Sequence, residues 1–215
     1  MKYWVFDLDG TLVDSFGHYF LILEDLLQQQ LTRDEKKILI GMHPEQIFKE
    51  RAPADKVQIY LDELQQRGIK NALEIQYYEQ IKPIFQTLKE SDRRIAVWTN
   101  RDYKSASHVL EKTDLFPHVE LLVSADCVTK RKPNPEGLMK IKDFFQCETR
   151  DMVMVGDHDH DMEAGKLLGA LALRASWHQQ WDDGQCPVAD EQFYSDRKFY
   201  DWIRSHPLMK VRASH

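Results

Sequence analysis

The sequence has few cysteines and no long apolar run, and both absences narrow the class of protein. Its three cysteines, Cys127, Cys147 and Cys186, are widely spaced, and no two have the CxxC spacing of redox or zinc sites. We therefore expect a reduced, cytoplasmic protein whose cysteines are structural or incidental. No apolar run approaches the roughly 18 residues of a membrane span, and the run at 3–6 is too short for a signal peptide. We expect no membrane partner.

A surplus of basic residues is also missing. The 29 lysines and arginines are outnumbered by 35 aspartates and glutamates, which gives a net charge of −6. The sequence therefore carries no basic surface of the kind that binds nucleic acid. A length of 215 residues, 42% of them hydrophobic, suits one domain or a core domain with a modest insertion. We expect a monomer, with a dimer as the alternative.

The stretch 3–11 organises the rest of the chain. Its first four residues are aromatic or β-branched, a short run that favours a strand buried on both faces of a parallel sheet. Asp7 and Asp9 follow two positions apart, so they point to the same side if the extended geometry continues. Gly10 then permits a sharp turn. The sequence thus predicts two carboxylates at the carboxyl end of a core strand, where open α/β sheets bind ligands.

Residues 15–82 have helical periodicity and no convincing strand. We expect five helices in this block, each with an apolar face or an end signal. They are 16–27 capped by Ser15, 33–40 ended by Gly41, a third begun by Pro44, a fourth carrying Val57, Leu61 and Leu64 and stopped by Gly68, and a fifth from 73 to 81.

From Pro83 onward, helical and strand patterns alternate, which indicates βαβ units and a parallel sheet. The expected strands are 95–98, 121–123, 152–155, 170–173 and a short 192–194. The expected helices contain residues 84–88, 103–112, 135–145 (with Leu138, Ile141, Phe144 and Phe145 facing the core), 162–168 closed by Gly169, and 199–203. The predicted fold is therefore α/β, a Rossmann-like parallel sheet flanked by helices over 1–14 and 83–206. An all-helical insert occupies 15–82, a loop occupies 176–187, and 207–215 form a frayed tail.

Polar side chains follow three of the predicted strands. The residues at these strand ends are Asp7 with Asp9, Thr99 with Asn100, and Asp157. The carboxyl ends of parallel strands converge on one edge of the sheet. Lys132 lies just before a predicted helix and is placed to reach the same edge. The sequence therefore predicts a cluster of carboxylates, hydrogen-bond donors and one ammonium group.

Four ordered motifs in this chain resemble those of the haloacid dehalogenase-like (HAD) hydrolases, in particular the phosphoglycolate phosphatase-like branch. They are Asp7-Leu8-Asp9-Gly10-Thr11, Thr99-Asn100, Lys132-Pro133, and Gly156-Asp157 followed by Asp161. The helical insert looks like the small α-helical cap of that family, and the resemblance covers nearly the whole chain. It departs at Lys82-Pro83-Ile84, where relatives often have Pro-Gly.

The resemblance implies a role for each motif residue. Asp7 would be the nucleophile that forms an aspartyl-phosphate. Asp9 would protonate the leaving oxygen and later activate water. Thr99 and Asn100 would hold phosphate oxygens, and Lys132 would neutralise those oxygens and keep Asp7 ionised.

A divalent cation is needed because carboxylates repel phosphate. One carboxylate about 4 Å from a phosphate charge costs roughly 4 kcal/mol at an effective dielectric constant near 20. Oxygen ligands with room for water favour Mg²⁺. We expect Asp7, the backbone carbonyl of Asp9 and Asp157 as ligands, while Asp161 either binds through water or orients Lys132.

Each motif also has a simpler interpretation. Asp9 is a residue type that forms turns before glycine, and Lys132 has basic neighbours that are typical of a solvated loop. Thr99-Asn100 is also typical of a helix cap.

The acidic stretch at 157–161 fits other metal sites poorly. An EF-hand loop would need glycine at Met162 and glutamate at Leu168, and a zinc site would need further Cys or His nearby. His158 and His160 differ from the small or polar residues expected in relatives. They are either solvent-facing or neighbours that tune the metal.

Substrate choice is expected to lie in the insert. Gly41-Met42-His43-Pro44 resembles a cap loop that approaches the leaving group in relatives. Met42, His43, Lys49 and Arg51 are the candidates for specificity, and ordinary surface roles are the alternative.

We therefore predict a Mg²⁺-dependent phosphatase of small phosphorylated metabolites. A sugar phosphomutase of the same superfamily is the alternative, and a phosphate-binding protein without activity is a third possibility. A dehalogenase is disfavoured, because Asp9 and the metal carboxylates would be superfluous. No P-loop is present.

Overall fold

The computed structural model describes residues 1–71, 74–178 and 184–206. Its main sheet has the strand order β5-β4-β1-β6-β7-β8, and every neighbouring pair is parallel. The strands are β1 (Tyr3–Phe6), β4 (Arg94–Trp98), β5 (Leu121–Val123), β6 (Met152–Gly156), β7 (Leu171–Ala175) and β8 (Glu191–Phe193). The α/β class predicted from the sequence is confirmed.

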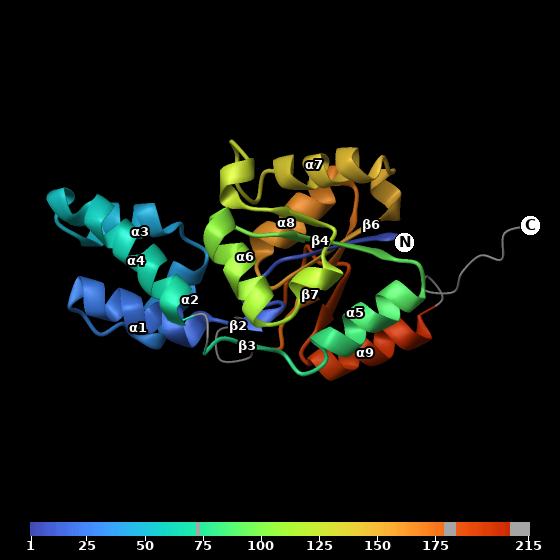
Figure 1. Ribbon diagram of the computed structural model, residues 1–215, viewed down its shortest axis with the longest axis horizontal. Helices are drawn as coiled ribbons and strands as arrows, with labels where there is room; N and C mark the ends of the chain where they lie inside the picture. Colours follow the sequence, from blue (N-terminus) through green and yellow to red (C-terminus); the bar gives the residue numbers. More distant parts are fainter. Residues whose placement is uncertain (72–73, 179–183, 207–215) are drawn as a thin grey trace, which may run out of the picture.

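Helices cover both faces of this sheet, as Figure 1 shows. Alternate residues of β1 point to opposite faces, so Trp4 and Phe6 enter one core cluster and Val5 enters the other. The first cluster includes residues of α5 (Ile81–Glu90), α6 (Tyr103–Lys112) and α9 (Asp196–Ser205), and the second includes residues of α7 (Glu136–Phe145) and α8 (Asp159–Leu168). The 3₁₀ turns are Ala54–Lys56, Phe116–His118, Ala125–Cys127 and Thr149–Asp151.

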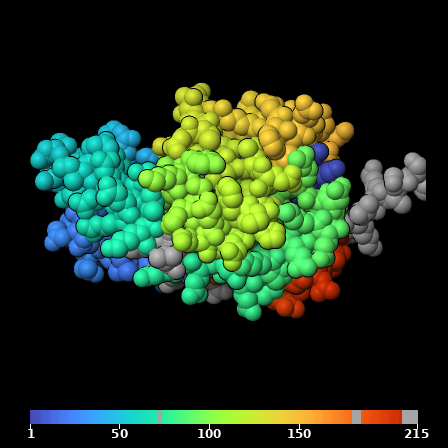
Figure 2. Space-filling view, in the orientation of Figure 1, coloured from blue at the N-terminus to red at the C-terminus, as the bar shows by residue number. Residues whose placement is uncertain are grey.

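The inserted helices pack on one another beside the sheet and form a separate lobe in the space-filling view (Figure 2). They are α1 (Phe16–Leu27), α2 (Arg33–Ile40), α3 (Pro44–Arg51) and α4 (Val57–Asn71). Phe20, Leu23 and Phe48 lie in their shared core. The domain boundaries at 14/15 and 82/83 stay a prediction.

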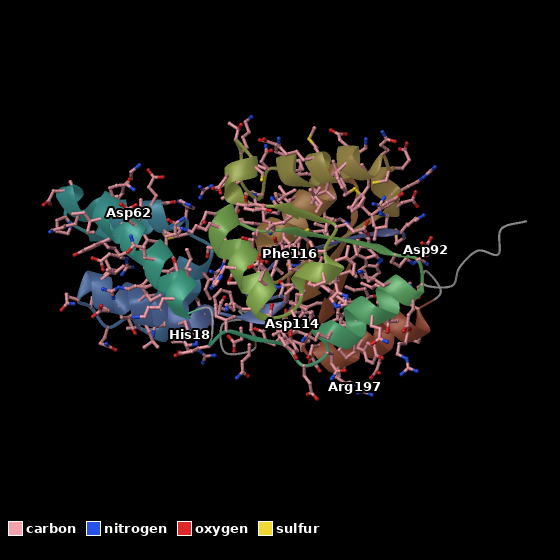
Figure 3. All side chains as sticks on the ribbon, viewed as in Figure 1. His18, Asp62, Asp92, Asp114, Phe116 and Arg197 are labelled. Carbon is pink, nitrogen blue, oxygen red and sulfur yellow. The ribbon has the colours of Figure 1, made fainter. Side chains whose placement is uncertain are left out.

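A small antiparallel ribbon connects the two ends of the insert, which corrects the expectation that residues 16–82 contain no strand. It pairs β2 (Val13–Asp14) with β3 (Gln76–Tyr77). Residues 74–80 are a turn and a strand, not part of a helix over 73–81, and residue 73 lies outside the described residues. The cause is tertiary, because Tyr77 lies opposite Val13 and the Tyr78 N–H donates to the carbonyl of Leu12. Across this junction, Nδ1 of His18, which is labelled in Figure 3, lies 3.6 Å from Glu74 Oε2.

Three further local expectations were wrong. Helix α4 continues through Gly68, because packing of its apolar side offsets the roughly 1 kcal/mol helix penalty of glycine. Ser15 precedes α1 but makes no capping hydrogen bond, since its hydroxyl donates to Asp9 instead. Phe144 is 52% exposed and contacts the ring of Phe145.

No helix within the described residues has the length and apolar character needed to span a bilayer. The three cysteines are free, with Cys127 exposed and Cys147 and Cys186 buried. The predicted tail at 207–215 and part of the predicted loop, 179–183, lie outside the described residues.

The insert contains one buried carboxylate with a pH-dependent contribution to stability. Glu24 of α1 is 8% exposed, contacts Lys36 of α2 at 2.8 Å and accepts from the Leu31 N–H at 2.9 Å. Burial acts to raise the pKa of Glu24, but the hydrogen bonds from Lys36 and Leu31 together lower it by more, so the net shift is downward.

Glu24→Gln is expected to lower the free energy of unfolding by about 1–3 kcal/mol near neutral pH. Because the folded pKa lies below the unfolded one, this stabilisation is complete above about pH 4.3 and is lost as the pH falls through the folded value. Urea unfolding at about pH 7 and about pH 3 should show the difference from wild type shrinking in acid. The control Glu45→Gln removes an exposed ion pair with Lys49 and should change little. A difference that does not depend on pH would contradict this origin.

Candidate active site

Three adjacent strands bring the predicted catalytic residues to one edge of the sheet. β1 lies between β4 and β6, and Phe6 pairs with Val97 on one side and Val155 on the other. Asp7 therefore lies between the ends of β4 and β6, and its N–H continues the ladder to the Val155 carbonyl at 2.8 Å. The convergence expected from parallel strands places Asp7 beside residues about 90 and 150 positions further along the chain.

A buried ammonium group binds these strand ends together. Lys132 Nζ lies 2.6 Å from Asp7 Oδ1 and 2.6 Å from Asp161 Oδ1, and it donates to the Trp98 carbonyl at 2.7 Å. These contacts use all three N–H donors of the ammonium group. Burial acts to lower the pKa of Lys132, but the carboxylates of Asp161 and Asp7 raise it more. Lys132 is therefore a buried charge and not the solvated charge of the alternative interpretation.

Three carboxylates surround one small space. Asp7, Asp157 and Asp161 each offer an oxygen within 4.8 Å of the others, and all three residues are buried. The pKa of Asp7 is raised well above its usual range, first by burial and then by the neighbouring acidic groups, against the opposing effect of Lys132. When all three are ionised, the carboxylates outnumber the ammonium group by two charges, so a hard divalent cation with oxygen ligands fits this set.

Asp157 is fixed by Thr11, which belongs to the first motif but was given no role from the sequence, and by His178, which no motif indicated. Thr11 Oγ1 donates to Asp157 Oδ1 at 3.2 Å, and the buried His178 places Nε2 3.2 Å from Oδ2. Burial acts to raise the pKa of Asp157, but His178 and the neighbouring cations lower it more. Gly10, with φ +78°, lies so close that a Cβ there would be 2.5 Å from Asp157 Oδ2. Only glycine suits this approach.

Asp9 lies apart from the three-carboxylate cluster and has its own partner. Arg101 donates Nε to Asp9 Oδ2 and Nη2 to Oδ1, both at 2.7 Å, and Ser15 donates to Oδ1 as well. Burial acts to lower the pKa of Arg101, but Asp9 raises it more. Its position directly after Thr99-Asn100 is the one feature of the sequence that could have identified Arg101 as a site residue.

The second motif is divided between a buried and an exposed residue. Thr99 is 1% exposed and accepts a hydrogen bond from the Arg101 N–H at 3.1 Å, whereas Asn100 is exposed. The helix-cap interpretation of this pair is wrong, because Asp102 caps α6 by accepting from the Ser105 N–H. A role in holding phosphate oxygens stays a prediction.

The four candidates in the insert have contacts within the insert. His43 caps α3 by accepting from the Glu45 N–H at 3.3 Å, Arg51 contacts Glu35 at 2.8 Å, and Lys49 contacts Glu45. Met42 packs on the apolar core of the insert. Their roles in specificity stay predictions.

The insert nevertheless reaches the site through another residue of the same loop. A Cβ at Gly41 would lie 2.6 Å from His158 Nε2, so the insert approaches the half-buried His158 closely. His158 is held in turn by the His160 N–H and ring. Within the described part of the chain, a cavity of about 90 Å³ opens here between α2 and the sheet edge. Its lining includes Lys37, Ile40, Asp157, His158, Arg174 and His178.

The family follows from this fold and its sequence. The model of the haloacid dehalogenase-like hydrolase family matches residues 4–174, which is most of the chain. The chain belongs to this family, as the four motifs predicted, and it is a hydrolase.

Individual relatives are similar over most of their length. The phosphoglycolate phosphatase of Aquifex aeolicus is 28% identical over 186 residues, with 82% of this chain and 85% of that protein covered. Pyrophosphatase PpaX of Listeria welshimeri is 26% identical over 180 residues, covering 80% and 82%. The crystal structure of CbbY from Rhodobacter sphaeroides in complex with phosphate has a TM-score of 0.83 at 15% identity, covering 93% of this chain and 96% of that one. This last likeness confirms the fold.

Removal of the ammonium group should destabilise the site far more than removal of a surface lysine. Lys132→Met leaves the carboxylates without their neutralising charge, so we expect the free energy of unfolding to fall by about 3–5 kcal/mol. Urea denaturation in EDTA measures this. The control Lys166→Met removes an exposed ion pair with Asp190 and should cost less than about 1 kcal/mol. Equal losses in the two variants would show that Lys132 is not structurally central.

Proposed function

We propose that this protein is a Mg²⁺-dependent phosphatase that hydrolyses small phosphomonoesters through an aspartyl-phosphate on Asp7. The supporting observation is the buried set of Asp7, Asp157 and Asp161 around Lys132 Nζ. A carboxylate beside an ammonium group is a suitable nucleophile for a phosphoryl group, because the cation offsets the repulsion between the two anions. The printed names of the two relatives, a phosphoglycolate phosphatase and a pyrophosphatase, support phosphoryl transfer to water.

The first half of the reaction makes one bond and breaks one. Asp7 Oδ1 is bound to Lys132, so the other oxygen, Oδ2, attacks phosphorus. The bond from phosphorus to the leaving oxygen breaks, and Asp9 donates a proton to that oxygen. Lys132 holds Asp7 in place and offsets charge on the phosphoryl group.

The second half regenerates the enzyme. Asp9 takes a proton from water, whose oxygen attacks phosphorus and displaces Asp7 as a free carboxylate. Inorganic phosphate leaves. Mg²⁺, held by Asp7, Asp157 and the Asp9 backbone carbonyl with Asp161 nearby, would supply the positive charge that lets an anionic substrate bind among carboxylates.

The remaining expectations belong to this proposal. The substrate is a small phosphorylated metabolite, chosen by the helical insert, and neither nucleic acid nor membrane is a partner. The protein acts in the cytoplasm as a monomer. The net charge of −6 supports the absence of a nucleic-acid partner, and the three free cysteines support the cytoplasm as the location.

The nucleophile is tested by Asp7→Asn. We expect release of inorganic phosphate from a generic aryl phosphate with Mg²⁺ to fall by at least about 1,000-fold, because an amide cannot accept the phosphoryl group. The control Asp14→Asn changes an exposed aspartate a few residues along the chain and should leave the rate unchanged. Most of the activity surviving in Asp7→Asn would rule out the covalent step.

The cation is tested without relying on activity. Saturating Mg²⁺ should raise the free energy of unfolding of the wild type, by about 2.7 kcal/mol at 100 times the dissociation constant. Asp157→Asn should abolish this rise. Asp62→Asn, which changes an aspartate on the insert far from the site, should retain it (Figure 3). A Mg²⁺ response that persists in Asp157→Asn would place the cation elsewhere.

A panel of phosphorylated metabolites with two readouts separates the alternatives. Release of inorganic phosphate supports the phosphatase. Accumulation of a sugar bisphosphate with little free phosphate would instead identify a phosphomutase. Tight binding without turnover under saturating Mg²⁺ would identify a protein that only binds phosphate ligands.

A further inference from the structure

Asp9 is held by a planar fork of hydrogen bonds. Arg101 Nε and Nη2 each lie 2.7 Å from one of its carboxylate oxygens. Such a bidentate pair fixes the plane of a carboxylate as well as its position, which a lysine cannot do. The side chains of Arg101 and Asp9 are only 19% and 24% exposed, so water screens this pair less than a surface ion pair.

The fork is itself held rigidly. Arg101 Nη1 donates to Ser105 Oγ on α6 at 2.9 Å, and its backbone N–H donates to Thr99 Oγ1 at 3.1 Å. The guanidinium group is therefore anchored to α6, and the Arg101 backbone is anchored to Thr99 of the second motif. Ser15, at the start of the insert, adds one more donor to Asp9.

These contacts direct three of the five N–H donors of the Arg101 side chain to Asp9 and Ser105. Its Nε and Nη2 face Asp9, and its Nη1 faces Ser105. A carboxylate oxygen accepts more than one hydrogen bond, so Asp9 keeps capacity for a proton or a water while the fork holds it. The effect of Arg101 on the reaction therefore passes through Asp9.

We propose that Arg101 is a positioning residue, which fixes the Asp9 carboxylate in the orientation that proton transfer requires. This inference rests on the proposed function, in which Asp9 exchanges protons with the leaving group and with water. Without the fork, Asp9 keeps the hydrogen bond from Ser15, but a single hydrogen bond does not fix the plane of its carboxylate for both halves of the reaction. Ser105 contributes by holding the guanidinium group in plane.

The experiment compares Arg101→Gln, Arg101→Lys and Ser105→Ala with wild type and a matched control. Arg94→Gln is that control, because Arg94 also binds a carboxylate through Nε and Nη2, at 2.8 Å and 2.5 Å from one oxygen of Glu120, at the opposite end of β4. The readouts are kcat and KM for one aryl phosphate, the Mg²⁺ dissociation constant by calorimetry, and thermal unfolding.

In Arg101→Gln, kcat should fall on the order of 10-fold to 100-fold, the effect of a misplaced catalytic group. KM and the Mg²⁺ dissociation constant should stay within about 2-fold, because no ligand contact is lost. Arg101→Lys should be intermediate, since it restores charge without the fork. Ser105→Ala should lower kcat by about 5-fold, the effect of one lost hydrogen bond. Arg94→Gln should leave kcat unchanged.

A second comparison tests the route through Asp9. Under single-turnover conditions, Arg101→Gln should slow the wild type but should not slow Asp9→Asn any further.

Two results would overturn the inference. A rise in KM larger than the fall in kcat would make Arg101 a substrate ligand, and unchanged kinetics in folded Arg101→Gln and Ser105→Ala would make the fork merely structural. Failure of the proposed function has a different signature, because the wild type would then release no phosphate from any member of the metabolite panel.

Discussion

One buried ammonium group holds the active site together. Lys132 Nζ contacts Asp7, Asp161 and the Trp98 carbonyl, and so connects the ends of β1 and β4 and the first turn of α8 to the loop before α7. Burial of several carboxylates without such a partner would cost several kcal/mol per ion. The ammonium group neutralises only part of the charge. The same arrangement that allows the acidic residues to be buried therefore leaves room for a divalent cation and, with it, an anionic substrate.

The two acidic groups of the first motif have different surroundings, and their proposed roles differ accordingly. Asp7 lies in the buried cluster beside Lys132, where burial and its neighbours raise its pKa. Asp9, two residues later, turns toward Arg101 and Ser15. A nucleophile needs a cation that holds it beside phosphorus, whereas a group that transfers protons needs a fixed direction. The helical insert meets this site where Gly41 approaches His158, so the part of the chain proposed to select the substrate adjoins the residues proposed to carry out the reaction.

Much of the fold was predictable because most elements have strong local periodicity. The strand 95–98 and the helix 103–112 lie almost where the sequence placed them. Errors arose where a distant contact decided the local structure. Residues 76–77 form a strand because β2 is there to pair with them, and the Ser15 hydroxyl turns to Asp9 and leaves α1 uncapped. Phe144 had the right spacing for the core and still points outward.

By itself, the sequence determined which residue types follow each strand and in what order, since a short apolar run and the polar residues after it are local features. It therefore predicted that Asp7, Lys132 and Asp157 would meet. Only the tertiary structure decided which side chains hold them in place. Arg101 and Asp9 are 92 positions apart, and Thr11 and Asp157 are 146 apart. Hydrogen bonds over such separations depend on how strands and loops pack, and no spacing pattern within the chain encodes them.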